Sequence, residues 1–362
     1  MTLIAWFILI FTILQMLVAL TNFLIGSNLP ETGRNYDDMV SVLIPARNEE
    51  NNIGNILEDL IKQDHNNIEI IVFNDQSEDR TAGIVREYSL SDKRINLIES
   101  EGLPEGWLGK NHACHRLSEK ARGRYLLFLD ADVHIGNRLI DNAIAFTNRH
   151  DTGLISIFPK QIIVSAGEKI TVPNMNLILV SLLPLILVRK LRFPSLAAAN
   201  GQFMFFRQDV YKKILPHQLM KNNMVEDIAI AREFKRKCIR IAYLLGDVNI
   251  SCRMYTGFSD AVSGFSKNVI DFFGGSFLTA FLFWLITSFG FLAVLFFLPP
   301  LFLCFYLASY ILTRVFVSAA SCQSIFYNIV FILPLQLSMG IFIYKAFINK
   351  KFRKFKWKGR NI

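Results

Sequence analysis

Apolar residues fill both ends of this chain and leave a charged stretch between them. No charged residue occurs in residues 1–29, and residues 3–25 are almost continuously apolar. In residues 272–347 the only charged side chains are those of Arg314 and Lys345. Because a helix needs about 20 apolar residues to cross a bilayer, both ends predict membrane-spanning helices. An ordinary soluble globule is thereby excluded.

The two apolar ends differ in the number of spans that they predict. Residues 1–26 form one N-terminal anchor, without the basic start and small-residue cleavage site of a signal peptide. Residues 272–348 form a C-terminal membrane region with three candidate spans, 276–298, 301–318 and 325–347.

The net charge of +9 comes mainly from the C-terminal tail, residues 349–362. Seven Lys and Arg and no acid occur in the last thirteen residues, which leaves 9 − 7 = +2 for the remainder. Such a tail beside a membrane span indicates contact with anionic lipid and does not indicate a nucleic-acid partner. The five Cys show no CxxC pair, which disfavours a disulfide framework and a structural zinc site.

The positive-inside rule places both the charged stretch and the basic tail in the cytoplasm, so we expect a multi-pass protein of the cell membrane. This topology requires an even number of crossings after the charged stretch, whereas three candidates are found. Either one candidate lies in the interface or another apolar segment crosses. Residues 177–188, which contain Pro184, are too short to span, and we expect an interfacial amphipathic segment there.

The charged stretch, residues 39–268, has the pattern of an α/β domain. Short β-rich runs at residues 41–45, 68–73, 95–98 and 125–129 read as buried parallel strands. Between the first two, apolar residues recur on one face of a predicted helix at residues 53–61. This alternation predicts a mainly parallel sheet covered by helices.

Acidic residues follow two of these strands. Asp75 follows the second strand, and Asp130-Ala-Asp132 follows the fourth. Ligands of open α/β sheets bind at the carboxyl ends of the strands, and two carboxylates at this spacing suit Mg²⁺ or Mn²⁺ bound with substrate phosphates. Acids at strand ends are also common as solvated turn residues, so this motif alone leaves both readings open.

A third acidic pair, Glu226-Asp227, opens a predicted helix at residues 225–237. Acids stabilise the N-terminus of a helix, and a carboxylate there also suits a general base. The sequence contains no dinucleotide-binding GxGxxG after a strand and no P-loop. His112, Cys114 and His115 are close in sequence, but we expect a packed or solvated helix surface there rather than a metal site.

Five motifs occur in order: residues 41–50 (SVLIPARNEE), 74–81 (NDQSEDRT), 106–110 (GWLGK), 129–132 (LDAD) and 226–227 (ED). Together they closely resemble the family 2 glycosyltransferases of the GT-A fold. Within that family they are most similar to the membrane-bound subgroup that includes carotenoid (diaponeurosporenoate) glycosyltransferases. The resemblance covers roughly residues 40–268 and the end of the tail, and it implies a mixed, mainly parallel GT-A sheet.

The resemblance also implies roles for single residues. Pro45, Arg47, Glu49 and Asp75 match positions that hold the uracil and ribose of a UDP-sugar, and Asp130 matches a position near the ribose. Asp132 matches the ligand of a divalent cation on the diphosphate.

Further matches concern the reacting groups. Asp227 matches the general base, and Lys110 matches a residue that reaches the donor phosphates. Residues 200–202 (NGQ) resemble a segment on the acceptor side. Arg253 matches a pyrophosphate contact, but the surrounding Gln-x-x-Arg-Trp motif is incomplete here, which argues against processive polymer synthesis.

The implied activity is inverting transfer of a sugar from a UDP-sugar, glucose-like by analogy, to a hydroxyl or carboxylate of a lipid-type acceptor at the cytoplasmic face of the membrane. One alternative is sugar transfer to a polyprenyl phosphate. Another is an inactive nucleotide-binding membrane scaffold, which would not need the acids at residues 130, 132 and 227.

Overall fold

The computed structural model describes residues 1–352, 356–357 and 360–361, with side chains described as far as Lys350. The predicted contact of the basic tail with anionic lipid therefore concerns side chains that lie almost entirely outside the described residues. The chain forms two compact units. The sheet unit consists of residues 28–160 and 187–252, and the helical unit consists of residues 1–27, 161–186 and 253 onward.

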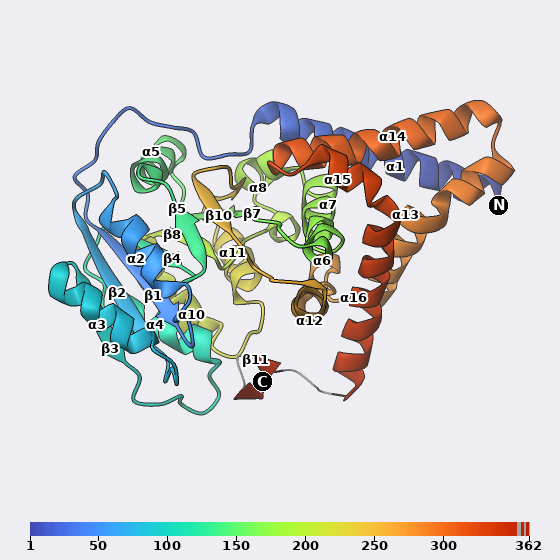
Figure 1. The fold of residues 1–362 in the computed structure, drawn as a ribbon. Helices are drawn as coiled ribbons and strands as arrows, with labels where there is room; N and C mark the ends of the chain where they lie inside the picture. Colours follow the sequence, from blue (N-terminus) through green and yellow to red (C-terminus); the bar gives the residue numbers. More distant parts are fainter. Residues whose placement is uncertain (353–355, 358–359, 362) are drawn as a thin grey trace. The chain divides into compact units, whose positions relative to one another are not determined.

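The sheet unit is built on a seven-stranded sheet with the order β3-β2-β1-β4-β8-β6-β9. Its strands are β1 (Val40–Ala46), β2 (Ile68–Asn74), β3 (Ile95–Glu99), β4 (Tyr125–Leu129), β6 (Leu154–Phe158), β8 (Phe203–Arg207) and β9 (Ile241–Leu245). Strands β1, β2, β3, β4 and β8 of this sheet are labelled in Figure 1. All neighbours pair in parallel except β8, which is antiparallel to β4 and β6. The predicted mixed, mainly parallel sheet is confirmed. In a second, short sheet of order β5-β10-β7, strand β5 (Val133–Ile135), which follows β4 in the chain, pairs antiparallel with β10 (Ile250–Cys252), which follows β9.

The four strands predicted from sequence are all present. Strands β1, β2 and β4 are almost wholly buried, as a covered parallel sheet requires, whereas the edge strand β3 buries only Ile95. Every residue of β2 and β4 is buried. Helices pack on the sheet, with α4 (Gly109–Lys120) on β1 and β2 and α3 (Thr81–Ser91) on β2 and β3. The other helices of the unit are α2 (Ile53–Ile61), α5 (Leu139–His150), η1 (Pro194–Leu196), α9 (Gln208–Ile214), α10 (Pro216–Leu219) and α11 (Glu226–Arg236).

Two elements lie where the chain passes between the units, namely β7 (Lys160–Gln161) and α8 (Leu185–Lys190). The helical unit contains α1 (Thr2–Ile25), α6 (Ala166–Lys169), α7 (Pro173–Leu182), α12 (Phe258–Asn268), η2 (Asp271–Phe273), α13 (Phe277–Phe297), α14 (Pro300–Ala320), α15 (Ile325–Val330) and α16 (Ile332–Phe352). The strands β11 (Lys356–Trp357) and β12 (Arg360–Asn361) follow.

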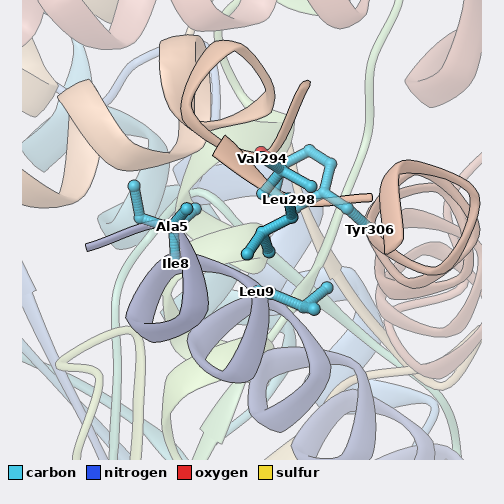
Figure 2. Close-up of a cluster of buried hydrophobic side chains, with 6 residues drawn as sticks. All are labelled: Ala5, Ile8, Leu9, Val294, Leu298 and Tyr306. Atoms are coloured by element: carbon cyan, nitrogen blue, oxygen red, sulfur yellow. The ribbon is translucent and has the colours of Figure 1, made fainter. Parts of the chain in front are cut away.

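Four helices among the described residues are long and apolar enough to cross a membrane: α1, α13, α14 and residues 332–350 of α16. The third C-terminal span expected at residues 325–347 is not one continuous helix, because α15 ends at Val330 and α16 begins at Ile332. An apolar cluster joins α1 to α13 and α14, as Figure 2 shows; its members are Ala5, Ile8, Leu9, Val294, Leu298 and Tyr306.

Helix α7 is an interior helix of this unit, not the interfacial segment expected from residues 177–188. Its residues from Pro173 to Ser181 are all buried, and it packs on α1, α14 and α16. Nδ2 of Asn22 donates to the carbonyls of Val180 and Leu183, each at 2.8 Å. A buried helix bonded in this way has no free apolar face for a membrane surface. Residues 161–186 and 253–268, predicted with the α/β domain, thus belong to the helical unit.

Candidate active site

The carboxyl ends of β1, β2 and β4 lie at one edge of the sheet because these strands are parallel. Asp75 follows β2 and donates its backbone N–H to the carbonyl of Ala46 at 2.8 Å. Strand β8 runs in the opposite direction, so the segment before it reaches the same edge. There Asp130 donates its backbone N–H to the carbonyl of Gln202 at 3.2 Å.

The loops after β1 and β2 are bonded to each other. Nη1 of the buried Arg47 donates to the carbonyl of Asp75 at 2.6 Å, and Oδ1 of Asn48 accepts from the backbone of Glu78 at 2.9 Å. Pro45 lies beyond the last β1–β4 pair, which joins Leu43 to Phe128, so its missing N–H removes no bond to β4. The four residues expected to hold a nucleoside therefore lie on β1 and on two connected loops.

Lys110 lies among acidic groups at this edge. It is the second residue of α4, and its Nζ lies 2.7 Å from Oδ1 of Asp130 and 3.9 Å from Oε1 of Glu226. Burial opposes the charge of the ammonium, but the carboxylates of Asp130 and Glu226 outweigh that effect and raise the pKa of Lys110. The lysine is therefore a fixed cation in a pocket of carboxylates.

Glu226 and Asp227 lie in the first turn of α11. There they can stabilise the N-terminus of the helix and also take part in a reaction. Oδ2 of Asp227 accepts the backbone N–H of Gly201 at 3.0 Å, and Oδ1 accepts that of Ile228 at 2.8 Å. Burial raises the pKa of Asp227. Burial and the charge of Asp227 also raise the pKa of Glu226 to about 7, although Lys110 opposes this.

Asp132 lies close to the acids Asp130 and Glu49 and carries a carboxylate oxygen that could bind a cation. Its Oδ1 is buried and has no hydrogen-bond partner among the described residues. Burial and the charges of Asp130 and Glu49 raise the pKa of Asp132 to about 6. A hard divalent cation prefers such oxygen ligands, so these residues fit one. Among the described residues no cluster of three His, Cys, Asp or Glu side chains could hold a metal ion by itself, and further oxygens would come from the donor diphosphate.

Two members of the site were not assigned from sequence. Glu226 was seen only as part of the Glu-Asp motif, whereas the structure places it beside Lys110. Cys252 is buried in β10 and accepts from Nε2 of Gln202 at 2.9 Å. No local pattern indicates the role of Cys252, because its position depends on the pairing of β10 with β5 next to Asp132.

Arg253 and the histidines of α4 make other contacts. Arg253 belongs to the helical unit, where its Nη2 donates to Oε1 of the fully buried Glu168 at 2.8 Å. In the sheet unit His112 packs edge-on between the rings of Phe73 and Trp107. The expected pyrophosphate contact of Arg253 stays a prediction.

Comparison with known proteins finds a family that part of the chain matches. Residues 41–215 match the model of the family described as Glycosyl transferase family 2. The chain is 28% identical over 239 residues to a 4,4'-diaponeurosporenoate glycosyltransferase of Staphylococcus haemolyticus, covering 64% of this chain and 60% of that protein. It is 26% identical over 270 residues to the protein of the same name from Staphylococcus aureus strain USA300, covering 69% and 66%. The alignments thus span less than two thirds of the length of these relatives.

A solved structure resembles the fold of the chain. The mannosyltransferase PcManGT from Pyrobaculum calidifontis superposes with a TM-score of 0.57 at 15% identity, covering 97% of this chain and all of that one. At this identity the likeness concerns the fold alone.

Proposed function

We propose that the chain is a family 2 glycosyltransferase, an inverting enzyme that transfers a sugar from a UDP-sugar, glucose-like by analogy, to a lipid. The acceptor is a carotenoid-type molecule that presents a hydroxyl or carboxyl group. Support for this class of acceptor comes from the name of the two staphylococcal relatives.

The observation that carries the proposal is the group of Lys110, Asp130, Glu226 and Asp227 at the carboxyl edge of the sheet. In the proposed reaction an acceptor oxygen attacks the anomeric carbon and forms the new C–O bond. The bond from that carbon to the diphosphate breaks, and its electron pair stays on the UDP oxygen. A single displacement of this kind inverts the anomeric carbon.

Asp227 would act as the general base. Both of its oxygens are held by backbone N–H groups, which fixes the carboxylate, and burial raises its pKa towards the range in which a base works at neutral pH. It would accept the proton of an attacking hydroxyl, whereas an ionised acceptor carboxylate attacks without giving up a proton. The Lys110 cation would offset negative charge that develops on the leaving diphosphate.

The same edge fits a divalent cation, Mg²⁺ or Mn²⁺, with Asp132 as the protein ligand. PcManGT, which shares the fold, was solved with GDP-Man and Mn²⁺, which supports a nucleotide sugar and a cation here. Such an ion would supply Lewis-acid stabilisation of the leaving diphosphate. The nucleoside would be held by Pro45, Arg47, Glu49 and Asp75, with Asp130 near the ribose, and Arg253 would contact the pyrophosphate.

The four apolar helices are compatible with a membrane protein. We propose a multi-pass cell-membrane protein whose catalytic residues face the cytoplasm, where UDP-sugars occur, and whose basic tail contacts anionic lipid. Residues 39–268 would supply the catalytic domain, between an anchor at residues 1–26 and a membrane region at residues 272–348.

The test uses the full chain purified in detergent. A panel of nucleotide sugars with Mg²⁺ or Mn²⁺ and a lipid extract should yield a glycolipid and release of nucleotide, both dependent on the metal and the lipid. A donor preference for UDP-sugars is expected. Sugar transfer only to polyprenyl phosphate would replace the acceptor, and an absence of any transfer with all donors would contradict the proposal.

A further inference from the structure

The helical unit contains an apolar groove between α13 and α16 that the reaction described above does not use. Its volume is about 630 Å³. Resting on the proposed function, we propose that this groove binds the apolar chain of the acceptor, a long polyene carboxylate, with the carboxylate at the end nearest Lys350.

The groove is formed by one face of each helix. The lining residues of α13 begin at Phe277 and end at Trp284, while those of α16 extend from Leu337 to Phe347. Phe277 contacts Phe347, with ring centroids 5.5 Å apart, and Trp284 lies against Gly340. The helices are therefore antiparallel along the groove, which is about 10–15 Å long at 1.5 Å per residue.

The shape of the groove depends on a glycine. A Cβ at Gly340 would lie 2.9 Å from the indole ring of Trp284, so only glycine lets this ring lie against α16. Nε1 of Trp284 donates to the carbonyl of Gln336 at 2.8 Å. Its one polar group is therefore already bonded, and the ring presents apolar surface. A flat wall of this kind suits a stiff conjugated chain.

The surroundings of the groove indicate what kind of molecule binds in it. Both helices are long and apolar enough to lie in a membrane, where the available ligands are hydrocarbon chains. At one end Nζ of Lys350 lies 5.3 Å from the ring centroid of Phe277, which lines the groove. A cation at one end of an apolar groove matches an amphiphile with an anionic head and a long chain.

The test measures binding without any sugar donor. Tritiated all-trans-retinoic acid, a polyene carboxylate, is titrated against the full chain in detergent. Leu337→Trp fills the groove, and Leu333→Trp is the matched control, because Leu333 lies one turn earlier on the same helix, is 75% exposed and does not line the groove. Each variant is checked by circular dichroism for unchanged helix content and thermal unfolding, which report an intact fold without any sugar donor.

We expect Leu337→Trp to weaken retinoate binding about tenfold, the equivalent of roughly two buried methylene groups, and Leu333→Trp to bind as the wild type does. Lys350→Glu should weaken retinoate binding several-fold but not the binding of retinol, the neutral alcohol of the same chain. Equal retinoate binding by the two tryptophan variants, or full displacement by neutral phosphatidylcholine, would overturn the proposal. The binding assay involves no sugar transfer, so its result can be interpreted even if the proposed function is wrong.

Discussion

The ammonium of Lys110 lies 2.7 Å from a carboxylate oxygen of Asp130, although the two residues belong to different elements, α4 and the turn after β4. Within the sheet unit this pair joins the strand-end acids to the acids of α11. The Lys110 side chain is 25% exposed, and its ammonium is bonded to one carboxylate and close to a second, so its removal leaves uncompensated negative charge in the site.

Lys110→Met should therefore lower kcat/KM about 100-fold, within the range for loss of one electrostatic contact to a developing charge. Steady-state kinetics with the preferred donor measures this effect. Lys120→Met, at the exposed end of the same helix, serves as the control and should retain wild-type kinetics. Full activity of Lys110→Met would remove this residue from the donor site.

With an acceptor that attacks through a hydroxyl, Asp227→Asn should reduce kcat about 1,000-fold while donor binding changes little, because the amide keeps the shape of the carboxylate but cannot take a proton. Calorimetric titration with the UDP-sugar and a transfer assay together separate the two effects. Glu233→Gln, two turns further along α11 and paired with Arg236 and Lys237, should be near neutral. If transfer by Asp227→Asn were unimpaired, another group would be the base.

The rate should fall on the acidic side of neutrality. A base must be deprotonated, and raised carboxyl pKa values move that requirement to higher pH. With Glu226 at about 7 and Asp132 at about 6, the group titrates as a unit, and kcat/KM should decline as the pH falls from about 7 to about 6. Glu226→Gln removes a like charge beside Asp227 and should shift this decline to lower pH. An unshifted profile would show that Glu226 does not influence the essential base.

Chelation of divalent cations should abolish transfer, and Mg²⁺ or Mn²⁺ should restore it. Asp132→Asn removes a charged oxygen ligand, so the metal concentration for half-maximal rate should rise about tenfold or more. Glu119→Gln, exposed on α4, provides the control. Equal metal dependence in Asp132→Asn and the wild type would exclude Asp132 as a ligand.

Much of the local structure could be predicted from sequence because it depends on near neighbours in the chain. The apolar runs at β1, β2, β3 and β4 predicted buried strands, and the apolar face of α2 predicted its helix. Ile53, Ile56, Leu57 and Leu60 of that face are all buried. The acids of the site were likewise identified, because motifs at strand ends and helix starts are local patterns.

The limits of prediction appear where distant segments meet. The short length of residues 177–188, Pro184 and the cations that follow predict an interfacial segment. In the structure α7 is buried, and its own Asn174 donates to Oγ of Ser338, 164 residues away, at 2.8 Å. A pattern of apolar residues within ten positions gives no information about a hydrogen-bond partner so far away in the chain.

Hydrophobic periodicity and turn chemistry act over a few residues, so the apolar ends, the α/β stretch between them and the acids after its strands could be identified without the structure. Which side chains meet is a property of the folded chain. The reversed direction of β8 brings Gly201 to within 3.0 Å of the Asp227 carboxylate, and the placement of α4 brings Lys110 to Asp130. These contacts depend on the packing of elements that are far apart in the chain.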